Sequence, residues 1–149
     1  MIKPMIKNEK QYRITKAQAR RFEDALAELH RKERPANITS RLWQAQRDAA
    51  ESQLRDLQEQ VAAYERLHVG KSKELLLEAV EDLPKTLIRA RIASGMTQEG
   101  LAQRLGVKPQ QVQRYEATEY ESASFARILK VVQALGLTMP KPARLVRNG

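Results

Sequence analysis

Hydrophobic positions in the first half of the chain recur at helical spacing. From Thr15 to about residue 32, Phe22, Leu26 and Leu29 fall on one face of a helix. Gln18 stands three residues after Thr15, where a capping box needs it. We therefore predict a first amphipathic helix that begins at Thr15.

A longer helix is predicted after a break. The break, ERPANITS, contains Pro35 and offers Thr39 or Ser40 as a helix cap. The helix should run over residues 41–67, and Gly70 ends it. Its apolar residues keep heptad spacing and are Trp43, Ala50, Leu54, Leu57, Val61 and Tyr64. The pattern predicts a helical hairpin over residues 1–70, packed on itself or on a second copy.

A third amphipathic segment, KSKELLLEAVEDLP, follows the hairpin. Ser72 can cap a short connecting helix over residues 71–82. Its apolar face is Leu75, Leu76, Leu77 and Val80. We expect this face to dock on the following domain or to join an oligomer interface.

The stretch TQEGLAQRLGVKPQQVQRYEA, residues 97–117, has the spacing of a helix-turn-helix. Counted from Gln98, the fifth residue is Ala102, which is small enough for two helices to cross closely, and the ninth is Gly106, which tolerates a turn with positive φ. Pro109 suits the first turn of the second helix. The residues that should face inward are Leu101, Leu105, Val107, Val112 and Tyr115.

The side chains left outside on the second helix point to DNA as the ligand. They are Lys108, Gln110, Gln111, Gln113 and Arg114. No acidic residue follows until Glu116, whereas a solvated helix usually mixes both signs of charge. Glutamine can bond adenine and arginine can bond guanine in the major groove. These five residues are our candidates for base contacts.

One helix before this stretch and one after it complete a compact domain over residues 83–138. The first has Pro84 in its opening turn and an inward stripe of Leu87, Ile88 and Ile92. The last is expected to turn Phe125, Ile128, Leu129, Val132 and Leu135 inward and to end at Gly136. Residues 139–149 are predicted to be a basic tail.

Residues 83–138 resemble the Xre/Cro family of phage-type and bacterial repressors. The likeness rests on LPKTLIRARIASGMTQEGLAQRLGVKPQQVQRYEA and on SFARILKVVQALGL. It implies an all-α, lambda-repressor-like domain of four to five helices after the N-terminal hairpin. Two departures from the family pattern are Gly100, which should cost about 1 kcal/mol in helix propensity, and ATEYESAS, where many members have a shorter turn.

The resemblance also assigns roles to residues outside the second helix. A glutamine in the family clamps a backbone phosphate, and Gln98 matches it. Arg104 and Thr97 are further candidates for phosphate contacts. An arginine in the preceding helix pairs with a glutamate late in the recognition helix, and Arg91 and Glu116 match that structural ion pair.

The charge of the chain favours a polyanionic partner. The net charge is +9, and residues 84–149 hold 11 Lys and Arg against 4 Asp and Glu. The excess therefore lies with the helix-turn-helix, where phosphate binding would use it.

The composition offers little for catalysis or metal binding. The chain has no cysteine, which excludes disulfides, zinc ribbons and thiol nucleophiles. His30 and His68 both lie near predicted helix ends, where a basic residue suits the helix dipole, and no third ligand completes a metal site. We expect no enzyme activity, no cofactor and no metal. No apolar run is long enough for a membrane span, so we expect a cytoplasmic protein without a membrane partner.

The sequence therefore predicts a homodimer that binds double-stranded DNA and represses transcription. A second hypothesis is an antitoxin that neutralises a cognate toxin and represses its own operon, because NEKQY, FEDALAEL and LRDLQEQVAAYE are loosely similar to HigA-type antitoxins. A third is an adaptor whose front helices bind another protein. The interface of the dimer stays open among the hairpin, the Leu75–Val80 segment and the last helix.

Overall fold

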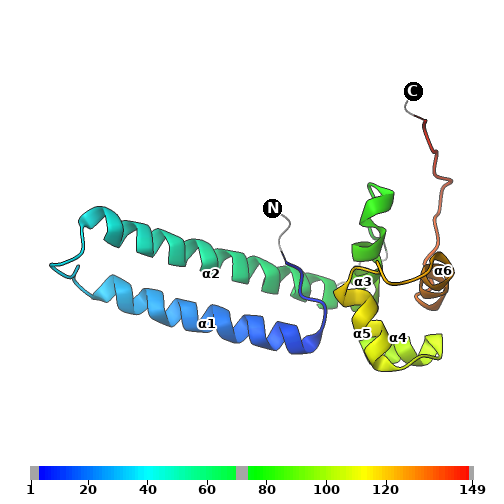
Figure 1. Ribbon diagram of the computed structural model, residues 1–149, viewed down its shortest axis with the longest axis horizontal. Helices are drawn as coiled ribbons and strands as arrows, with labels where there is room; N and C mark the ends of the chain where they lie inside the picture. Colours follow the sequence, from blue (N-terminus) through cyan, green and yellow to red (C-terminus); the bar gives the residue numbers. More distant parts are fainter. Residues whose placement is uncertain (1–3, 70–73, 148–149) are drawn as a thin grey trace. The chain divides into compact units, whose positions relative to one another are not determined.

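The computed structural model describes residues 4–69 and 74–147 (Figure 1). Within them the chain is all-helical, as predicted, with six α-helices and one short 3₁₀ helix, η1. It divides into two compact units, residues 1–73 and residues 74–149. None of the helices in the described residues combines the length and apolar character that a membrane span requires.

The first helix, α1 (Glu9–Arg31), begins earlier than predicted. Its cap is Asn8, whose Oδ1 accepts a hydrogen bond from the Gln11 backbone N–H at 2.9 Å. The Gln11 side chain in turn accepts from the Lys7 N–H at 2.8 Å, which completes a reciprocal capping arrangement. The predicted start at Thr15 was wrong because this stronger cap lies upstream of it.

The second helix, α2 (Ser40–Val69), runs antiparallel to α1 (Figure 1). Thr39, one of the two predicted caps, accepts a hydrogen bond from the Leu42 N–H at 3.2 Å through its Oγ1. Gly70, the predicted end of the helix, lies outside the described residues. The two helices form the predicted hairpin.

Facing residues in the hairpin recur at alternating steps of three and four, the spacing of a coiled-coil seam. In α1 they are Tyr12, Thr15, Ala19, Phe22, Leu26 and Leu29; in α2 they are Trp43, Arg47, Ala50, Leu54, Leu57, Val61 and Tyr64. Ala19, Leu26 and Tyr64 are buried, and the others stay half-buried. Arg47 is the charged exception, and its Nε is buried without a hydrogen-bond partner among the described residues.

Polar contacts fix the register of the two helices along one face. Lys16 pairs with Glu65 at 3.1 Å, the Gln58 amide donates to Glu23 at 2.8 Å, and His30 pairs with Glu51 at 3.3 Å. From one contact to the next, the residue in α1 lies seven positions later in the sequence and its partner in α2 lies seven positions earlier. Hydrogen bonds from Tyr12 and Lys16 hold the pKa of the Glu65 carboxyl below its usual range.

Stacked rings close the end of the hairpin where α1 begins. The ring centroids of Tyr12 and Tyr64 are 5.0 Å apart, and those of Tyr64 and His68 are 5.9 Å apart. Ile6, just before α1, is also buried. Aromatic packing therefore adds to the heptad seam at this end.

The predicted connecting helix over residues 71–82 is absent from the described part of that segment. Residues 74–78 have no regular secondary structure, and only Val80–Asp82 form the 3₁₀ turn η1. Ser72, the predicted cap, lies outside the described residues. Leu75 and Leu77 are half-buried while Leu76 is exposed, an alternation typical of extended chain. A short isolated helix gains too little to offset its nucleation cost.

The second unit packs four helices around a small core. They are α3 (Leu83–Ala93), α4 (Gln98–Leu105), α5 (Pro109–Ala117) and α6 (Phe125–Ala134). Each contributes at least one almost fully buried side chain: Leu87, Ile88, Leu101, Val112 and Val131. Pro84 lies in the first turn of α3, and Gly136 follows α6 with a φ of 64°, both as predicted.

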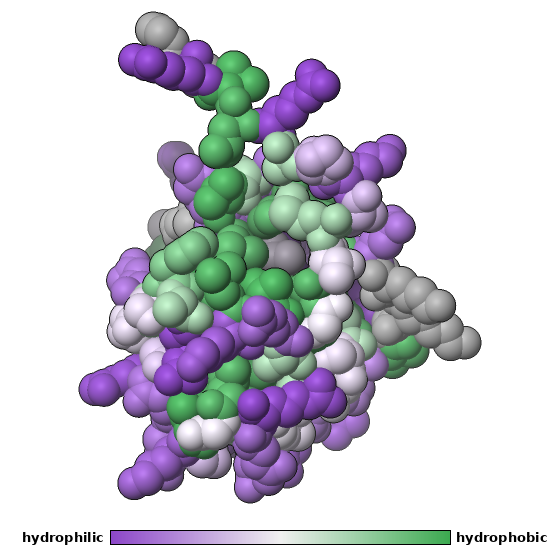
Figure 2. Space-filling view, turned by 90° about the vertical axis from the view of Figure 1, so that its right-hand side faces the viewer, coloured by the Kyte–Doolittle hydropathy of each residue, from purple (hydrophilic) through white to green (hydrophobic). Residues whose placement is uncertain are grey.

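The prediction for the inward face of α6 was partly wrong. Phe125 is 71% exposed and Leu129 is 46% exposed, whereas Val131 is the buried residue of the helix. Figure 2 shows apolar residues on the side of this unit where α6 lies. The helix has apolar residues around much of its circumference, so periodicity alone did not decide which of them face the core.

Gly106 ends α4 in the left-handed region, with a φ of 65°. A Cβ at this position meets no atom within 4 Å, so Gly106→Ala should cost only backbone strain, about 1–2 kcal/mol of unfolding free energy. Urea unfolding of the full chain measures it. Gly106→Asn is the matched control and should cost less, because asparagine tolerates this conformation. Equal stability of wild type and Gly106→Ala would contradict the assignment.

Candidate nucleic-acid interface

The turn between α4 and α5 sets the angle of the candidate recognition helix. Ala102 is completely buried, which allows the two helices to approach closely. The Gly106 N–H donates to the Gln103 carbonyl at 3.2 Å, and the Val107 N–H donates to the Ala102 carbonyl at 3.0 Å. These bonds satisfy carbonyls at the end of α4 and direct the chain into Pro109, the first residue of α5.

Glycine is unfavourable for helix formation at position 100, but the packing around this position explains its presence. A Cβ built there would lie 3.3 Å from Met96 Cγ and 3.3 Å from Thr97 Oγ1. Thr97 caps α4, and its Oγ1 accepts a hydrogen bond from the Gly100 N–H at 2.9 Å. The cap and its neighbour thus occupy the space that a side chain would need.

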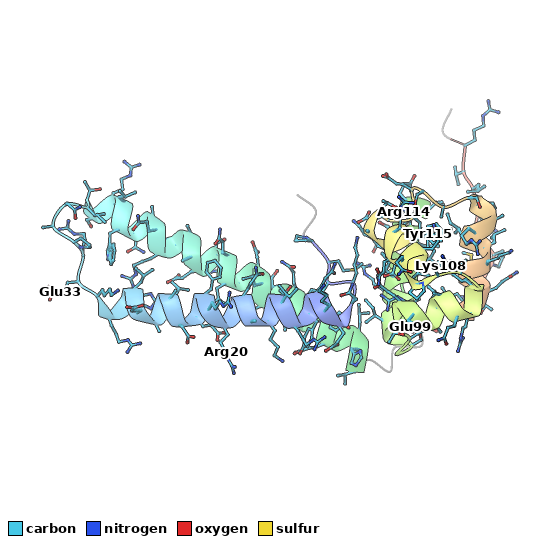
Figure 3. All side chains as sticks on the ribbon, turned by 60° about the horizontal axis from the view of Figure 1, so that its bottom comes forward. Arg20, Glu33, Glu99, Lys108, Arg114 and Tyr115 are labelled. Carbon is cyan, nitrogen blue, oxygen red and sulfur yellow. The ribbon has the colours of Figure 1, made fainter. Side chains whose placement is uncertain are left out.

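The outer face of α5 carries the five predicted base-contacting residues. Lys108, Gln110, Gln113 and Arg114 are exposed, and Gln111 is half-buried. Lys108 and Arg114 come from opposite ends of the helix (Figure 3). The opposite face is buried through Val112, Tyr115 and Glu116. Because Glu116 is buried, the exposed face of α5 presents only amides and cations.

The start of α5 is open to an anion. Lys108 occupies the cap position, and its side chain makes no capping hydrogen bond. Backbone N–H groups at a helix start carry partial positive charge and bind phosphate readily. The side chains and the helix start therefore favour the same kind of ligand.

A buried ion pair joins α3 to α5. Arg91 donates through Nε to Glu116 Oε1 at 2.5 Å and through Nη2 to Glu116 Oε2 at 2.9 Å. Arg91 is 3% exposed and Glu116 is 0% exposed. A third guanidinium nitrogen donates to the Met96 carbonyl at 2.8 Å, which ties down the loop before α4. These are the two residues expected to pair, and the contact to Met96 was not predicted.

Gln98 takes part in the same network. Its side-chain amide donates to Glu116 Oε2 at 2.6 Å, so the first residue of α4 is held against the recognition helix. The sequence analysis assigned Gln98 to a phosphate and missed this contact. No motif in the sequence indicates it, because the two residues meet only when α4 and α5 cross.

Arg104 has an intramolecular role in the structure. Its Nη1 donates to the Ala134 carbonyl at 2.9 Å, near the end of α6. A cation at a helix C-terminus interacts favourably with the dipole. The contact holds α4 against α6 and uses part of a guanidinium that we expected to face phosphate.

The turn after α5 is held by a buried tyrosine. Glu119 and Tyr120 both adopt positive φ, 49° and 63°, which costs energy for residues with a Cβ. Tyr120 is 3% exposed and stacks on Tyr115 with ring centroids 6.0 Å apart. Burial, and then the nearby Glu116 carboxylate, raise the pKa of the Tyr120 phenol. This turn is the segment ATEYESAS that departs from the family pattern.

Removing one partner of the Arg91–Glu116 pair should strongly destabilise the second unit. Glu116→Gln leaves the Arg91 charge buried without its counterion, so we expect a loss of about 3–5 kcal/mol. Chemical unfolding of the full chain, with helical content as the signal, measures it. The double variant Arg91→Met with Glu116→Leu should recover most of the loss, because it removes both charges. A double variant no more stable than Glu116→Gln would contradict this account.

Comparison with known protein families agrees with this geometry. Residues 87–141 match the family described as helix-turn-helix. The match begins within α3 and ends beyond α6, so it contains α4, the turn and α5. No curated protein and no solved structure matches the chain. The second unit is therefore a helix-turn-helix domain, and the match supports a DNA-binding regulator.

Proposed function

We propose that the protein is a homodimeric repressor of the Xre/Cro type that recognises an inverted repeat through the major groove. The observation that carries the proposal is the exposed face of α5, which holds two cations and three glutamines and no acid. Gln110, Gln111 and Arg114 are the residues that we assign to base edges, with Lys108 and Gln113 beside them.

Contacts to phosphate come from the two ends of α4. Gln98 is fixed by Glu116 through one amide hydrogen, which orients the rest of the side chain at the start of α4. Thr97 accepts from the Gly100 N–H, so its hydroxyl hydrogen can be donated to a phosphate oxygen. Arg104 is the weakest of the three candidates, because it already donates to Ala134.

One recognition helix contacts only a few base pairs, so a dimer with two such helices gains specificity. Two copies placed about 34 Å apart would read successive major grooves on one side of the duplex. The exposed apolar residues of α6, Phe125 and Leu129, supply a surface on the DNA-binding unit for such a contact (Figure 2). Single exposed apolar residues are common, but two at a spacing of four on one helix form a continuous stripe.

Selection of bound sequences from a random duplex pool, near physiological salt, tests the proposal. Purified full-length protein should enrich an inverted repeat whose half-sites lie about 10 base pairs apart. Enrichment of no sequence, with only salt-sensitive general binding, would mean that α5 contacts phosphate without reading bases.

Arg114→Ala should weaken binding to the selected sequence by about 1–3 kcal/mol and relax one base position in each half-site. Arg20→Ala is the matched control, since it removes an equal charge from the exposed surface of the hairpin. Titration of both variants on the selected duplex and on single-base variants measures the effect. Unchanged base preference in Arg114→Ala would remove its assigned role.

The second candidate function is an antitoxin that also represses its own operon. It is favoured by the division of the chain, because the hairpin forms a compact unit of its own beside the helix-turn-helix domain in the sequence, as a module that binds another protein would. This function adds to DNA binding and does not replace it. Copurification of the hairpin-bearing chain with the product of an adjoining gene would support it, and a chain that purifies alone from its native operon would argue against it.

A further inference from the structure

The two faces of the hairpin differ in chemistry. If the seam residues occupy positions a and d of a heptad, the e positions of both helices lie on one face and the g positions on the other. The e positions include all the residues of the three polar contacts that fix the register: Lys16, Glu23, His30, Glu51, Gln58 and Glu65. We call this side the bridged face.

The opposite side carries no charge at its g positions. These residues are Gln11, Gln18 and Ala25 in α1 and Gln46, Gln53, Gln60 and Leu67 in α2, and we call them the glutamine face. At the neighbouring c positions on this side, Ile14 and Leu42 are each 51% exposed, and Arg21, Glu28 and Asp56 are the charged residues. The side chains of Gln18, Gln46, Gln53 and Gln60 make no hydrogen bond to another described residue. The glutamine face therefore lacks the cover that the bridged face has.

The seam residues are incompletely buried, so a further covering surface would stabilise the hairpin. Of the thirteen seam residues named above, only Ala19, Leu26 and Tyr64 are buried. Polar contacts link the two helices on the bridged face, and the half-buried Phe22, Leu57 and Val61 keep apolar surface that a further element could cover. A single core in a unit of this size usually supplies only a small margin of stability, and oligomerisation is one way to add to it.

We propose that the glutamine face binds the same face of a second copy of the chain, so that two hairpins form a four-helix bundle. This inference rests on the proposed homodimer, which brings two hairpins together at high effective concentration. Each glutamine amide both donates and accepts hydrogen bonds, so glutamines can pair with their own copies. Two identical faces without charge at the g positions also place no like charges opposite one another there.

The size of the face suits a dimer. With 23 residues in α1, the face is about 34 Å long and about 20 Å wide, since each helix is about 10 Å across. Its projected area is roughly 700 Å², close to the ~800 Å² that each partner contributes to a specific interface. A strongly charged partner would instead need complementary charge, which the g positions do not offer.

Charge reversal of the face tests the proposal. Gln53→Glu with Gln60→Glu places four like charges in the proposed interface, so we expect the dissociation constant of the full-length dimer to rise at least 10-fold. Ser52→Glu with Ala45→Glu is the matched control, because these residues are exposed on the outer side of α2. Sedimentation equilibrium without DNA measures all three proteins, and far-ultraviolet circular dichroism checks that the variants remain helical.

Disulfide crosslinking gives an independent measurement, because the chain contains no cysteine of its own. Among the full-length variants Gln46→Cys, Gln53→Cys and Gln60→Cys, at least one should form a covalent dimer on mild oxidation, whereas Ser52→Cys should not. A crosslink between identical positions is expected where the two-fold axis places α2 against α2 of the other copy. Where the axis runs parallel to the helices, α2 faces α1 instead, and an equimolar mixture of Gln18→Cys and Gln60→Cys chains should then form the covalent dimer.

The outcomes separate this inference from the proposed function. Loss of the dimer in the glutamine-face variant alone, together with a crosslink, supports the bundle. A monomeric wild type, equal dissociation constants in all three proteins, or no crosslink in either arrangement overturns it, whatever the DNA selection shows. A crosslinked dimer that enriches no inverted repeat leaves the bundle standing and removes the proposed function.

Discussion

The buried contact between Arg91 and Glu116 is the interaction on which the DNA-binding unit depends. It connects α3, the loop before α4 and the recognition helix through one guanidinium, with hydrogen bonds to both carboxylate oxygens and to the Met96 carbonyl. Gln98 adds a bond from the start of α4 to the same carboxylate. A buried charge pair is weak evidence for net stability, but its geometry is specific. Its effect is to fix where α5 lies relative to the rest of the unit.

The same contact accounts for the character of the exposed face of α5. Burying Glu116 removes the one acid of the helix from the surface, so amides and cations are left outside. The side chains that hold α5 in place are therefore different from those that we assign to base edges. Arg104 and Tyr120 extend this bracing on either side, through the Ala134 carbonyl and through the stack with Tyr115. A rigid helix with free outer side chains is what base recognition needs.

A different constraint governs the hairpin. Two helices alone form a layer too thin to bury the residues between them completely. Heptad spacing on both helices and polar contacts one heptad apart give it a definite register. Two helices nevertheless leave most seam residues half-buried, because the described part of this unit contains no third helix. The uncharged glutamine face is the side from which that cover can come. In the proposed bundle, the hairpin gains stability by association rather than by a larger core of its own.

Local patterns in the sequence determined the all-α class, the hairpin, and the register of α4 and α5 about Gly106 and Pro109, because these depend on spacing and on the conformations that glycine and proline favour. The start of α1 is also determined locally, by the Asn8 cap, but the capping pattern at Thr15 led us to predict a later start. Tertiary structure alone decided that residues 74–78 stay extended, that Phe125 and Leu129 of α6 face outward, and that Gln98 meets Glu116. Each of these outcomes depends on which surfaces are covered by elements distant in the sequence. Local sequence patterns do not contain that information.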